Sequence, residues 1–526
     1  MRYFIPRICL LFRIWLYQST PSSLSASEAT MGSKDDELHV MFLPYMAPGH
    51  MMPLVDMARL FAAHGVRITI ITTTMNAFRF QNAIHRDIEA GRQIGLEILQ
   101  FPSVEAGLPE GCENLISTPT PEMSMKLFQA IRMMKPRMET LLRNHRPDCI
   151  ASDVLFHWTV DVAAELGIPR LSFSGSGYFN LCVSHCVERY QPHKDVSSET
   201  EIFLVPGLPD EIKLTRSQLP DLVKGRNEFS ELFDRLKEAE RKSFGTLMNS
   251  FYELEPAYAD YYRNNIGIKA WHIGPVSLFN KDAADKAERG NKASLDEDSW
   301  LSWLDSKKPN SVLYVCLGSL TRLSKTQLTE IASALEDSGH AFIWVVGKVL
   351  NSSGEEDGSH EWWLPEGFQE RAYQSGIGHI IRGWAPQVLI LEHPAIGGFL
   401  THCGWNSILE GVSSGLPMIT WPIFAEQFYN EKLVTQVLKL GVGVGNEVWK
   451  VWATEEMPLM SREKIRRAVT MVMDQGIAAD EMRRKASLLG ELAKKAIEKG
   501  GSSYNQLKAL IKEIRSFRQP PLCRNL

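Results

Sequence analysis

The sequence predicts an α/β protein made of two doubly wound domains, each built on a parallel sheet. Short apolar runs alternate with segments of helical spacing from residue 38 to about residue 173. The same alternation resumes at residue 312 and continues to residue 441, and a polar segment, 277–299, separates the two halves. Because strand, crossover helix and strand in succession form a right-handed parallel unit, each half is expected to fold on its own sheet.

Length and composition favour a globular protein with small-molecule partners. The 526 residues allow two to four domains, and 44% are hydrophobic and 23% charged. A formal net charge of −5 without long like-charge runs argues against nucleic-acid binding. Eight scattered cysteines without C-x-x-C pairs indicate reduced thiols in a cytoplasmic protein, and no metal site. No apolar run is long enough to span a membrane, and a monomer is expected.

Residues 1–37 are predicted to be an N-terminal extension without ordered structure. The first thirty residues are basic and then serine-rich, and Glu28 is their only acidic residue. Arg7 and Arg13 interrupt the apolar segment that a secretory signal peptide would need. A signal peptide, an organelle transit peptide and translation from a start codon upstream of Met31 therefore all stay open.

The N-terminal domain is expected over residues 38–276. Apolar runs predict strands at 38–44, 66–72, 96–101, 149–152 and 170–173. The segment YMAPGHMM follows the first strand as a loop, and a helix is expected from Pro53 to His64, with Gly65 as its stop. The linker 277–299 has the Asp, Lys and Ala composition of an exposed segment.

The C-terminal domain is expected over residues 300–502. A strand at 312–317 and a tight turn at Gly318 and Ser319 precede a helix that Ser324 and Gln327 begin with a capping box. Residues 351–361 are interpreted as a surface loop. The glycines of 441–445 lack the spacing of a dinucleotide fingerprint and are rejected as a cofactor site. A final helix, 503–518, carries one apolar side and begins with a second capping box.

The stretch from Trp384 to Gln427 concentrates the unusual chemistry. A short apolar strand ends at His402, and a helix is expected to begin near Asn406 and Ser407, whose free backbone N–H groups attract anions. His402 reaches the same anion, and Glu410, one turn into the helix, is placed to accept hydrogen bonds from ribose hydroxyls.

Three further side chains of this stretch suit a nucleotide sugar. Trp384 offers a flat platform for a base, and a second strand at 417–420 leads to a turn carrying Glu426 and Gln427. These two polar side chains are able to bond several sugar hydroxyls. Each piece alone is more often structural, and Gln427 is also suited to cap the following helix. Their joint occurrence favours a site.

The stretch resembles the signature of the plant secondary-product UDP-glycosyltransferases: W-A-P-Q at 384–387, H-C-G-W-N-S at 402–407 and E-Q at 426–427. The resemblance covers about residues 38–517, with one departure at Cys316-Leu317, where an aromatic residue is commoner at the second position. It implies the GT-B arrangement, in which two Rossmann-like domains face a cleft and the terminal helix crosses back to the N-terminal domain. It further implies no permanently bound cofactor and the following donor contacts: Trp384 stacking on uracil, base-edge contacts from Ala385 and Gln387, a sugar contact from Trp405, and a diphosphate held by Ser319, His402, Asn406 and Ser407.

The catalytic pair is expected at two strand ends. The pattern L-P-x-x-A-x-G-H-x-x-P around His50 resembles the family's catalytic loop, and an imidazole suits proton abstraction near neutrality. Asp153 ends a predicted strand and is expected to orient His50. A lone loop histidine is more often a surface residue, and Asp153 also suits a helix N-cap.

The resemblance implies inverting O-glycosylation of a small plant metabolite, with UDP-glucose as the donor co-substrate. In the family, glutamine at the position of Gln427 usually accompanies glucose, whereas histidine often accompanies galactose. The acceptor stays open among triterpenoids, steroids, flavonoids and other phenolics, and methionines of the N-terminal domain are candidates for its apolar wall. The alternatives are a catalytically silent nucleotide-sugar binding protein and, less favoured, an epimerase or a hydrolase.

Overall fold

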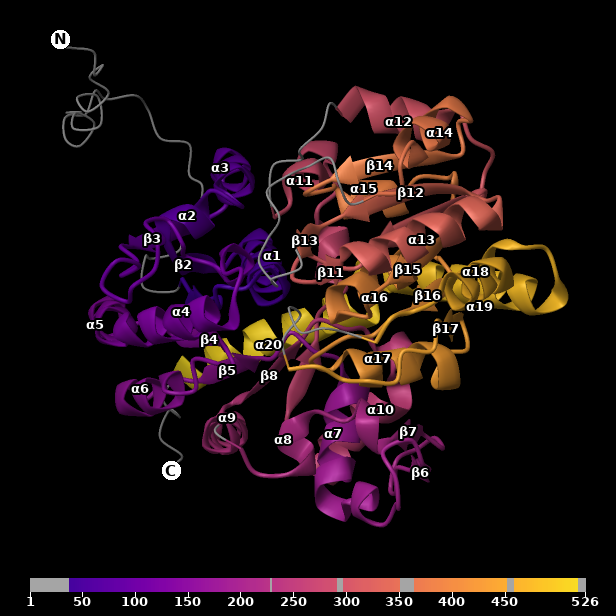
Figure 1. The fold of residues 1–526 in the computed structure, drawn as a ribbon. Coiled ribbons are helices and arrows are strands. Elements are labelled where there is room, and N and C mark those ends of the chain that lie inside the picture. The colour runs from indigo at the N-terminus through magenta and orange to yellow at the C-terminus, as the bar shows by residue number, and fades with distance from the viewer. Residues whose placement is uncertain (1–36, 228, 291–296, 351–363, 452–457, 519–526) are drawn as a thin grey trace, which may run out of the picture. The chain divides into compact units, whose positions relative to one another are not determined.

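A computed structural model describes residues 37–227, 229–290, 297–350, 364–451 and 458–518. Residues 38–526 form one compact unit, which carries two parallel sheets (Figure 1). None of the described helices is both long enough and apolar enough to cross a membrane. The predicted N-terminal extension, residues 1–37, and the predicted loop 351–361 cannot be compared, because 1–36 and 351–363 lie outside the described residues.

The first sheet has seven parallel strands in the order β3-β2-β1-β4-β5-β8-β9. All five residues of β1 are buried, as expected of a strand that helices cover on both faces. The strand order reverses between β1 and β4, and ligands of open α/β sheets bind at such a reversal. The strands are β1 (His39–Leu43), β2 (Arg67–Thr73), β3 (Ile94–Leu99), β4 (Cys149–Asp153), β5 (Arg170–Phe173), β8 (Gly245–Met248) and β9 (Ala270–His272).

The second sheet has six parallel strands in the order β14-β12-β10-β15-β16-β17. Its order reverses between β10 and β15, so the segments after these two strands meet at one edge. Both sheets are doubly wound, which confirms the predicted fold class. The strands are β10 (Val312–Cys316), β12 (Ala341–Val346), β14 (Gly378–Arg382), β15 (Ile396–Thr401), β16 (Met418–Thr420) and β17 (Gly441–Gly443).

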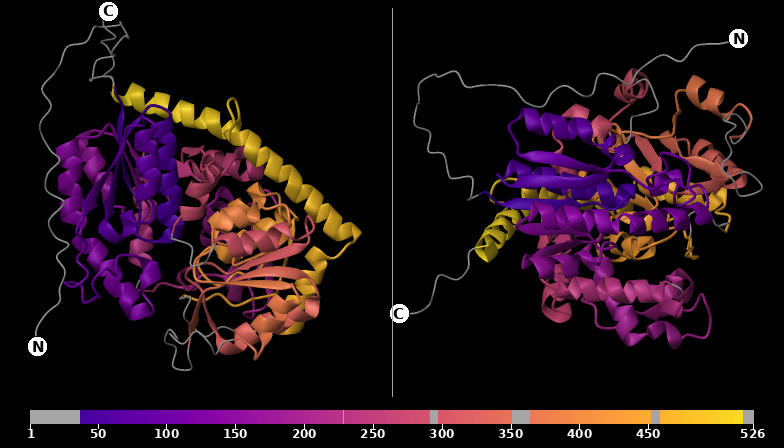
Figure 2. Two further views of the ribbon diagram at one scale, coloured as in Figure 1. Left: turned by 90° about the horizontal axis from the view of Figure 1, so that it is seen from above. Right: turned by 90° about the vertical axis from the view of Figure 1, so that its left-hand side faces the viewer.

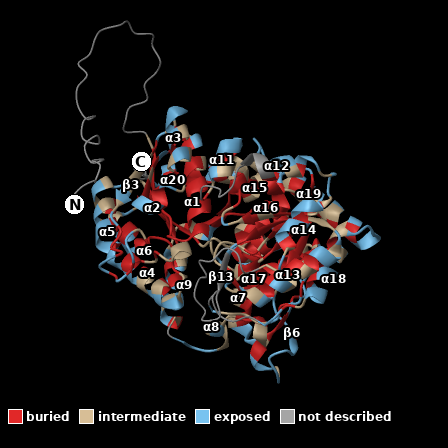
Figure 3. Ribbon diagram, turned by 45° about the horizontal axis from the view of Figure 1, so that its top comes forward, coloured by how far each residue is buried: buried red, intermediate tan, exposed pale blue. Residues whose placement is uncertain are grey.

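Helices surround both sheets, and most of them have one buried side (Figure 3). In the N-terminal half these are α1 (Pro48–Ala63), α2 (Thr74–Ala77), α3 (Gln81–Glu89), α4 (Pro121–Met133), α5 (Lys135–His145), α6 (Thr159–Leu166), α7 (Tyr178–Tyr190), α8 (Asp221–Lys224), α9 (Ser230–Lys242) and α10 (Pro256–Tyr261). In the C-terminal half these are α12 (Glu297–Asp305), α13 (Lys325–Ser338), α14 (Phe368–Gln374), α15 (Gln387–Leu391), α16 (Trp405–Ser413), α17 (Gln427–Lys432) and α18 (Arg462–Met473). Two small sheets pair β6 (Ile202–Leu204) with β7 (Lys213–Thr215) and β11 (Arg322–Ser324) with β13 (Lys348–Leu350).

The first helix begins five residues earlier than the sequence predicts. α1 starts at Pro48, so His50 lies in its first turn and not in a loop. Proline is favoured in the first turn, because its fixed φ suits a helix and its missing N–H would have no partner there. Pro53 is accommodated inside the helix, where it leaves the carbonyl four residues earlier, that of Gly49, without a helical partner.

The segment between the domains is not the irregular exposed linker that its composition predicts. Residues 283–288 form helix α11 (Ala283–Glu288), and Asn280 and Asp285 are buried. The buried guanidinium of Arg59 on α1 bonds both side chains, which explains why a segment without an apolar pattern is held in place.

Neither predicted capping box forms in full: the first forms by half, and Ser503 of the second lies inside the last helix, which begins at Ser502. Ser324 accepts the N–H of Gln327 as a cap, but the Gln327 amide bonds the backbone of Met460 instead of returning to Ser324. The hydroxyl of Ser503 donates to the carbonyl of Gly274 and so ties the last helix to the N-terminal half.

The last two helices are α19 (Ile477–Ile497) and α20 (Ser502–Arg518), the yellow helices of Figure 2. α20 packs beside β9. Its apolar side belongs to the same buried cluster as β1, β2 and α1, and consists of Leu507, Leu510, Ile511 and Ile514. The C-terminal end of the chain therefore completes the core of the N-terminal domain.

We predict that Leu510→Ala destabilises the protein by about 2–5 kcal/mol, because a fully buried leucine leaves a cavity when truncated. Leu488→Ala on α19 is the matched control, since Leu488 is 49% exposed and its loss should change stability by about 0.5 kcal/mol or less. Urea unfolding measures both. Equal, small losses would mean that α20 does not share the N-terminal core.

Candidate active site

The N-terminus of α1 places His50 beside Asp153. β1 and β4 are parallel neighbours, with Leu43 opposite Ser152, so the segments that follow them emerge together. The His50 Nδ1 atom lies 2.7 Å from the Asp153 Oδ2 atom. The His50 side chain is 32% exposed, whereas that of Asp153 is fully buried. One ring nitrogen of His50 is thus held by a buried carboxylate, while the ring stays partly accessible.

Asp153 is not a helix N-cap. The helix that follows, α6, begins only at Thr159, and Trp158 is its N-cap residue. The Asp153 Oδ1 atom accepts the backbone N–H of Leu155 at 3.0 Å, which leaves Oδ2 for His50. Each carboxylate oxygen therefore has a separate partner, and the orientation of the carboxylate is fixed.

The electrostatic surroundings favour a basic imidazole at position 50. Burial lowers the pKa of His50, but the charge of Asp153 and its hydrogen bond, together with the charge of Glu426, outweigh burial and raise the pKa above its usual 6.5. The pKa of Glu426 is raised, chiefly by burial. Tyr45 packs its ring edge against His50 at a centroid distance of 6.1 Å.

The N-termini of α1 and α16 are joined by a hydrogen bond. The Asn406 Nδ2 group donates to the Gly49 carbonyl at 2.9 Å, and this is the carbonyl that Pro53 leaves without a helical N–H. The Asn406 Oδ1 atom accepts from Asn249 Nδ2 at 3.4 Å. The residue before His50 is thus bonded directly to the first turn of α16.

Trp405 lies in the core and not at a ligand surface. Its side chain is 2% exposed, its indole N–H donates to the Asn249 carbonyl at 2.7 Å, and its ring packs against Gly177. The side chain is therefore committed to the core, and the predicted sugar contact of Trp405 stays a prediction for its backbone. Only the backbone N–H of Trp405, in the first turn of α16, remains for a ligand.

Three features surround the start of α16 at the edge where the second sheet reverses. The helix begins at Trp405 with Gly404 as its N-cap, and no side chain caps it. His402 lies between Gly318 and Gly404, at each of which an added Cβ would fall within 2.6 Å of the His402 Nε2 atom. Ser319 follows Gly318 on the same turn after β10. Glycine is required at 318 both by this close approach and by its φ of +83°.

His402 is uncharged at neutral pH. Burial lowers its pKa to about 4, and its buried Nδ1 atom has no hydrogen-bond partner among the described residues. A neutral imidazole contributes an N–H donor to an anion, but no positive charge. The Ser407 hydroxyl accepts from the Gln387 amide at 3.1 Å, which leaves its O–H to donate.

Gln387 and Glu410 form one network beside Trp384 and Ala385. The Gln387 Nε2 group lies 2.7 Å from the Glu410 Oε2 atom, and the Arg289 Nη1 group lies 2.6 Å from the Glu410 Oε1 atom. Glu410 is 5% exposed and Ala385 9%. Both oxygens of the carboxylate predicted to hold ribose are therefore bonded within the chain.

Gln427 is largely committed to a turn. It begins α17, and its Oε1 atom accepts the backbone N–H groups of Ile423 at 2.8 Å and Phe424 at 3.1 Å. The expectation that this amide both donates to and accepts from sugar hydroxyls is wrong for its oxygen, and only Nε2 remains as a donor. Glu426 is half-buried, and its carboxylate lies 3.5 Å from Asn430 Nδ2.

No three His, Cys, Asp or Glu side chains gather closely enough to hold a metal ion within the described ranges. The two strand edges carry an imidazole–carboxylate pair and hydrogen-bond donors at a helix N-terminus.

Comparison with known proteins identifies the family. Residues 36–278 match the model described as "Glycosyltransferase, N-terminal domain", and residues 284–482 match that described as "UDP-glucoronosyl and UDP-glucosyl transferase". Scopoletin glucosyltransferase of Nicotiana tabacum is 49% identical, with 91% of this chain and 98% of the relative covered. The chain belongs to the plant family 1 UDP-glycosyltransferases.

Two further proteins are similar to this glycosyltransferase over most of its length. UDP-glucose flavonoid 3-O-glucosyltransferase 7 of Fragaria ananassa is 51% identical over 91% of this chain and 97% of the relative. The crystal structure of UGT73P12 of Glycyrrhiza uralensis, complexed with glycyrrhetinic acid 3-O-monoglucuronide, superposes with a TM-score of 0.86. It is 46% identical, and 92% of this chain and 96% of that chain are covered. The predicted GT-B fold is thus confirmed, and the chain is a UDP-glycosyltransferase.

Two residues of the site in this glycosyltransferase were not found from the sequence. Asn249 directly follows β8, a strand that the sequence analysis missed, and a polar residue after a buried strand was the available signal. Arg289 lies in the segment interpreted as a linker, and no local pattern links it to Glu410, 121 residues away. The roles of the predicted donor residues stay predictions.

We predict that Gln427→Ala lowers stability even without donor, by about 1–3 kcal/mol, because the buried N–H groups of Ile423 and Phe424 lose their acceptor. Gln436→Ala is the matched control, since the exposed Gln436 amide also bonds backbone, at Lys213. Thermal unfolding of the donor-free variants measures both. If Gln427→Ala unfolds like the wild type, its amide does not hold the turn.

Proposed function

We propose that this glycosyltransferase transfers glucose from UDP-glucose to a hydroxyl group of a small plant metabolite, with inversion at the anomeric carbon. The hydrogen bond between His50 Nδ1 and Asp153 Oδ2 carries the proposal. A neutral His50 that donates its Nδ1–H to Asp153 presents the lone pair of Nε2 to an acceptor hydroxyl. The same pair argues against a catalytically silent binding protein, which needs no oriented base.

The proposed reaction is a single displacement. The acceptor oxygen attacks the anomeric carbon as its proton passes to His50 Nε2, and the bond between that carbon and the diphosphate oxygen breaks. UDP leaves with the bonding electron pair, so no covalent enzyme intermediate forms. The buried carboxylate of Asp153 stabilises the imidazolium that develops.

The diphosphate of the donor is proposed to lie at the N-terminus of α16. The uncapped N–H groups there and the helix dipole favour negative charge. His402 would donate as a neutral imidazole, Ser319 as a hydroxyl, and Asn406 would fix the position of the helix start through Gly49. Stabilising the departing charge in this way is worth several kcal/mol in enzymes that use preorganised donors.

UDP-glucose is the proposed donor, and the acceptor is a hydroxylated aglycone. Relatives that carry scopoletin and flavonoid in their names, and a neighbour bound to a glycyrrhetinic acid glucuronide, support this acceptor range. The predicted methionine wall is weaker than expected, because Met46, Met51, Met52 and Met134 are core residues. Specificity constants for UDP-glucose, UDP-galactose and UDP-glucuronate test the donor. A monomeric state and a cytoplasmic location belong to the same proposal and are tested by light scattering and by cell fractionation.

We predict that His50→Ala lowers turnover by about 10²–10⁴-fold, the usual range for loss of a general base. The affinity for UDP should change little, because His50 lies in α1 and the proposed diphosphate site in α16. Steady-state kinetics and UDP titration measure the two effects. Parallel losses of turnover and UDP affinity would make His50 a structural residue.

The pH dependence tests Asp153. In the wild type, kcat/KM should fall as pH drops through the raised pKa of His50, since the protonated imidazole cannot take a proton. In Asp153→Asn, the carboxylate charge that raises this pKa is gone, so the acidic limb should move to lower pH. The plateau should also fall, and less for phenols than for aliphatic alcohols, whose hydroxyls need more help. An unmoved limb contradicts the pairing.

A further inference from the structure

Residues 289 and 290 contact the side chains proposed to bind the nucleoside. Arg289 donates to Glu410 through Nη1 at 2.6 Å and to Asp56 on α1 through Nε at 3.0 Å. The backbone of Gly290 lies so close to Trp384 that an added Cβ would fall 2.3 Å from the Cζ2 atom of the indole ring. Glu410 and Trp384, the proposed ribose and base contacts, are thus already in contact with Arg289 and Gly290.

Residues 289 and 290 make contacts of the same kind that a bound nucleoside would make. The guanidinium supplies an N–H donor to Glu410, as a ribose hydroxyl would supply an O–H donor, and the Gly290 backbone lies close to the indole on which a base is proposed to stack. The fit is close, because Arg289 is 13% exposed and Glu410 5%. Breaking this pair without replacing the lost donors would leave a buried carboxylate short of partners, which is costly.

We propose that Arg289 and Gly290 occupy the nucleoside part of the donor site in the donor-free enzyme, and that Arg289 thereby sets the affinity for the donor. This inference rests on the proposed function, because it takes Trp384, Gln387 and Glu410 as nucleoside-binding residues. UDP then binds only by displacing Arg289 from Glu410, and the ribose hydroxyls replace the guanidinium donors.

The way in which the segment is attached makes displacement feasible. No apolar side chain longer than alanine occurs in residues 281–290, so the segment contributes little apolar packing. It is held by charged contacts instead: Asp285 with Arg59 and Arg86, Glu288 with Arg86, and Lys286 with Glu392. The carbonyl of Gly290 also accepts from Arg79 at 3.1 Å. The pairs of Glu288 with Arg86 and of Lys286 with Glu392 are partly exposed and contribute little each, whereas the pair of Asp285 with Arg59 is buried and is the firmest attachment of the segment.

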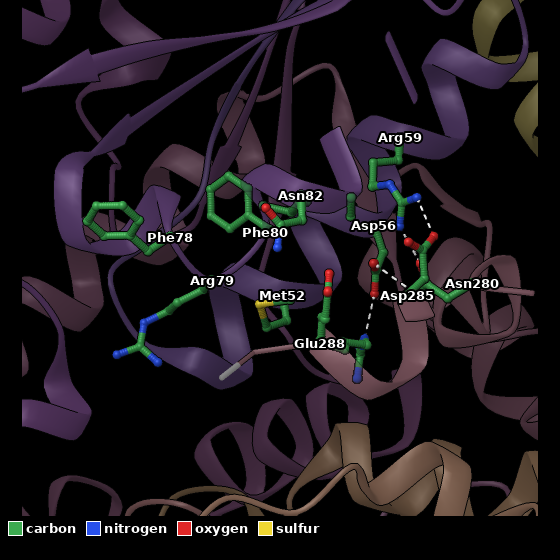
Figure 4. Close-up of a pocket in the computed structure, with 13 residues that line it drawn as sticks. Met52, Asp56, Arg59, Phe78, Arg79, Phe80, Asn82, Asn280, Asp285 and Glu288 are labelled. Atoms are coloured by element: carbon green, nitrogen blue, oxygen red, sulfur yellow. Dashed lines mark hydrogen bonds and ion pairs between the residues drawn. The ribbon is translucent and has the colours of Figure 1, made fainter. Parts of the chain in front are cut away.

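A small cavity lies between the segment and α1 (Figure 4). It has a volume of about 30 Å³ and is lined from α1 by Met52, Val55, Asp56 and Arg59, and from the segment by Asn280, Asp285, Glu288 and Arg289. A polar space of this size holds about one or two water molecules. The boundary between the segment and α1 is therefore not a close-packed core, which further eases its opening.

The first experiment compares variants of one segment. In Arg289→Ala, no guanidinium competes with UDP for Glu410. The Kd for UDP should therefore fall by about 3–10-fold, because a larger fraction of the enzyme is able to bind UDP. Lys286→Ala is the matched control: it breaks the ion pair with Glu392, away from Glu410, and should leave the Kd within about twofold. Inorganic pyrophosphate, which lacks the nucleoside, should bind the wild type and Arg289→Ala equally.

A weaker or unchanged UDP affinity in Arg289→Ala would overturn the inference, because Arg289 would then support the donor or have no role. Since a variant can fail to fold, hydrogen exchange of the wild type gives a second measurement. Saturating UDP should slow exchange in α16 and speed exchange in residues 283–290, as these leave the site. Slower or unchanged exchange in 283–290 together with a protected α16 would refute displacement. No protection of α16 would instead refute the proposed donor site, and the inference with it.

Discussion

The hydrogen bond from Asn406 to the Gly49 carbonyl joins the two halves of the catalytic apparatus. It exists because Pro53 has no N–H, so the carbonyl four residues earlier in α1 must find another donor. Asn406 supplies that donor from the first turn of α16. A proline inside one helix thus creates the acceptor that holds the start of a second helix beside the residue preceding His50.

α1 organises both chemical functions along its length. Its first turn carries His50, whose partner Asp153 comes from the neighbouring strand β4. Its third and fourth turns carry Asp56 and Arg59, which bond the segment that reaches Glu410. The proposed base and the proposed nucleoside contacts are therefore connected through one helix.

The sheets were predictable from the sequence, whereas the pairings at the site were not. Strands such as β1 and β4 are buried on both faces and so appear as continuous apolar runs. The start of α1 was misplaced because Pro48 and Gly49, read locally, are typical of a loop. Helix α11 was missed because ion pairs, and not an apolar stripe, hold it.

Side-chain partners far apart in the chain leave no local signal. His50 and Asp153 are separated by 103 residues, and only their strand-end positions and the resemblance to a family suggested that they meet. The resemblance, in turn, could not show that Trp405 is buried or that the Gln427 oxygen is used by a turn. Those facts depend on which backbone groups the surrounding fold leaves without partners.

The signature residues must be able to bind the donor and must also be hydrogen-bonded when the donor is absent. This explains why several of them bond one another. A donor site that is buried enough to exclude water must still satisfy its polar groups when no donor is present. Gln387 donates to both Ser407 and Glu410, and Arg289 donates to the other carboxylate oxygen of Glu410. The internal bonds hold these side chains in place before the ligand arrives, and preorganisation of this kind reduces the ordering cost of binding. Some of these bonds must be exchanged for bonds to the donor when it binds. The affinity for the donor is therefore the free-energy difference between two states whose polar groups are both hydrogen-bonded, and not the sum of the contacts that the donor makes.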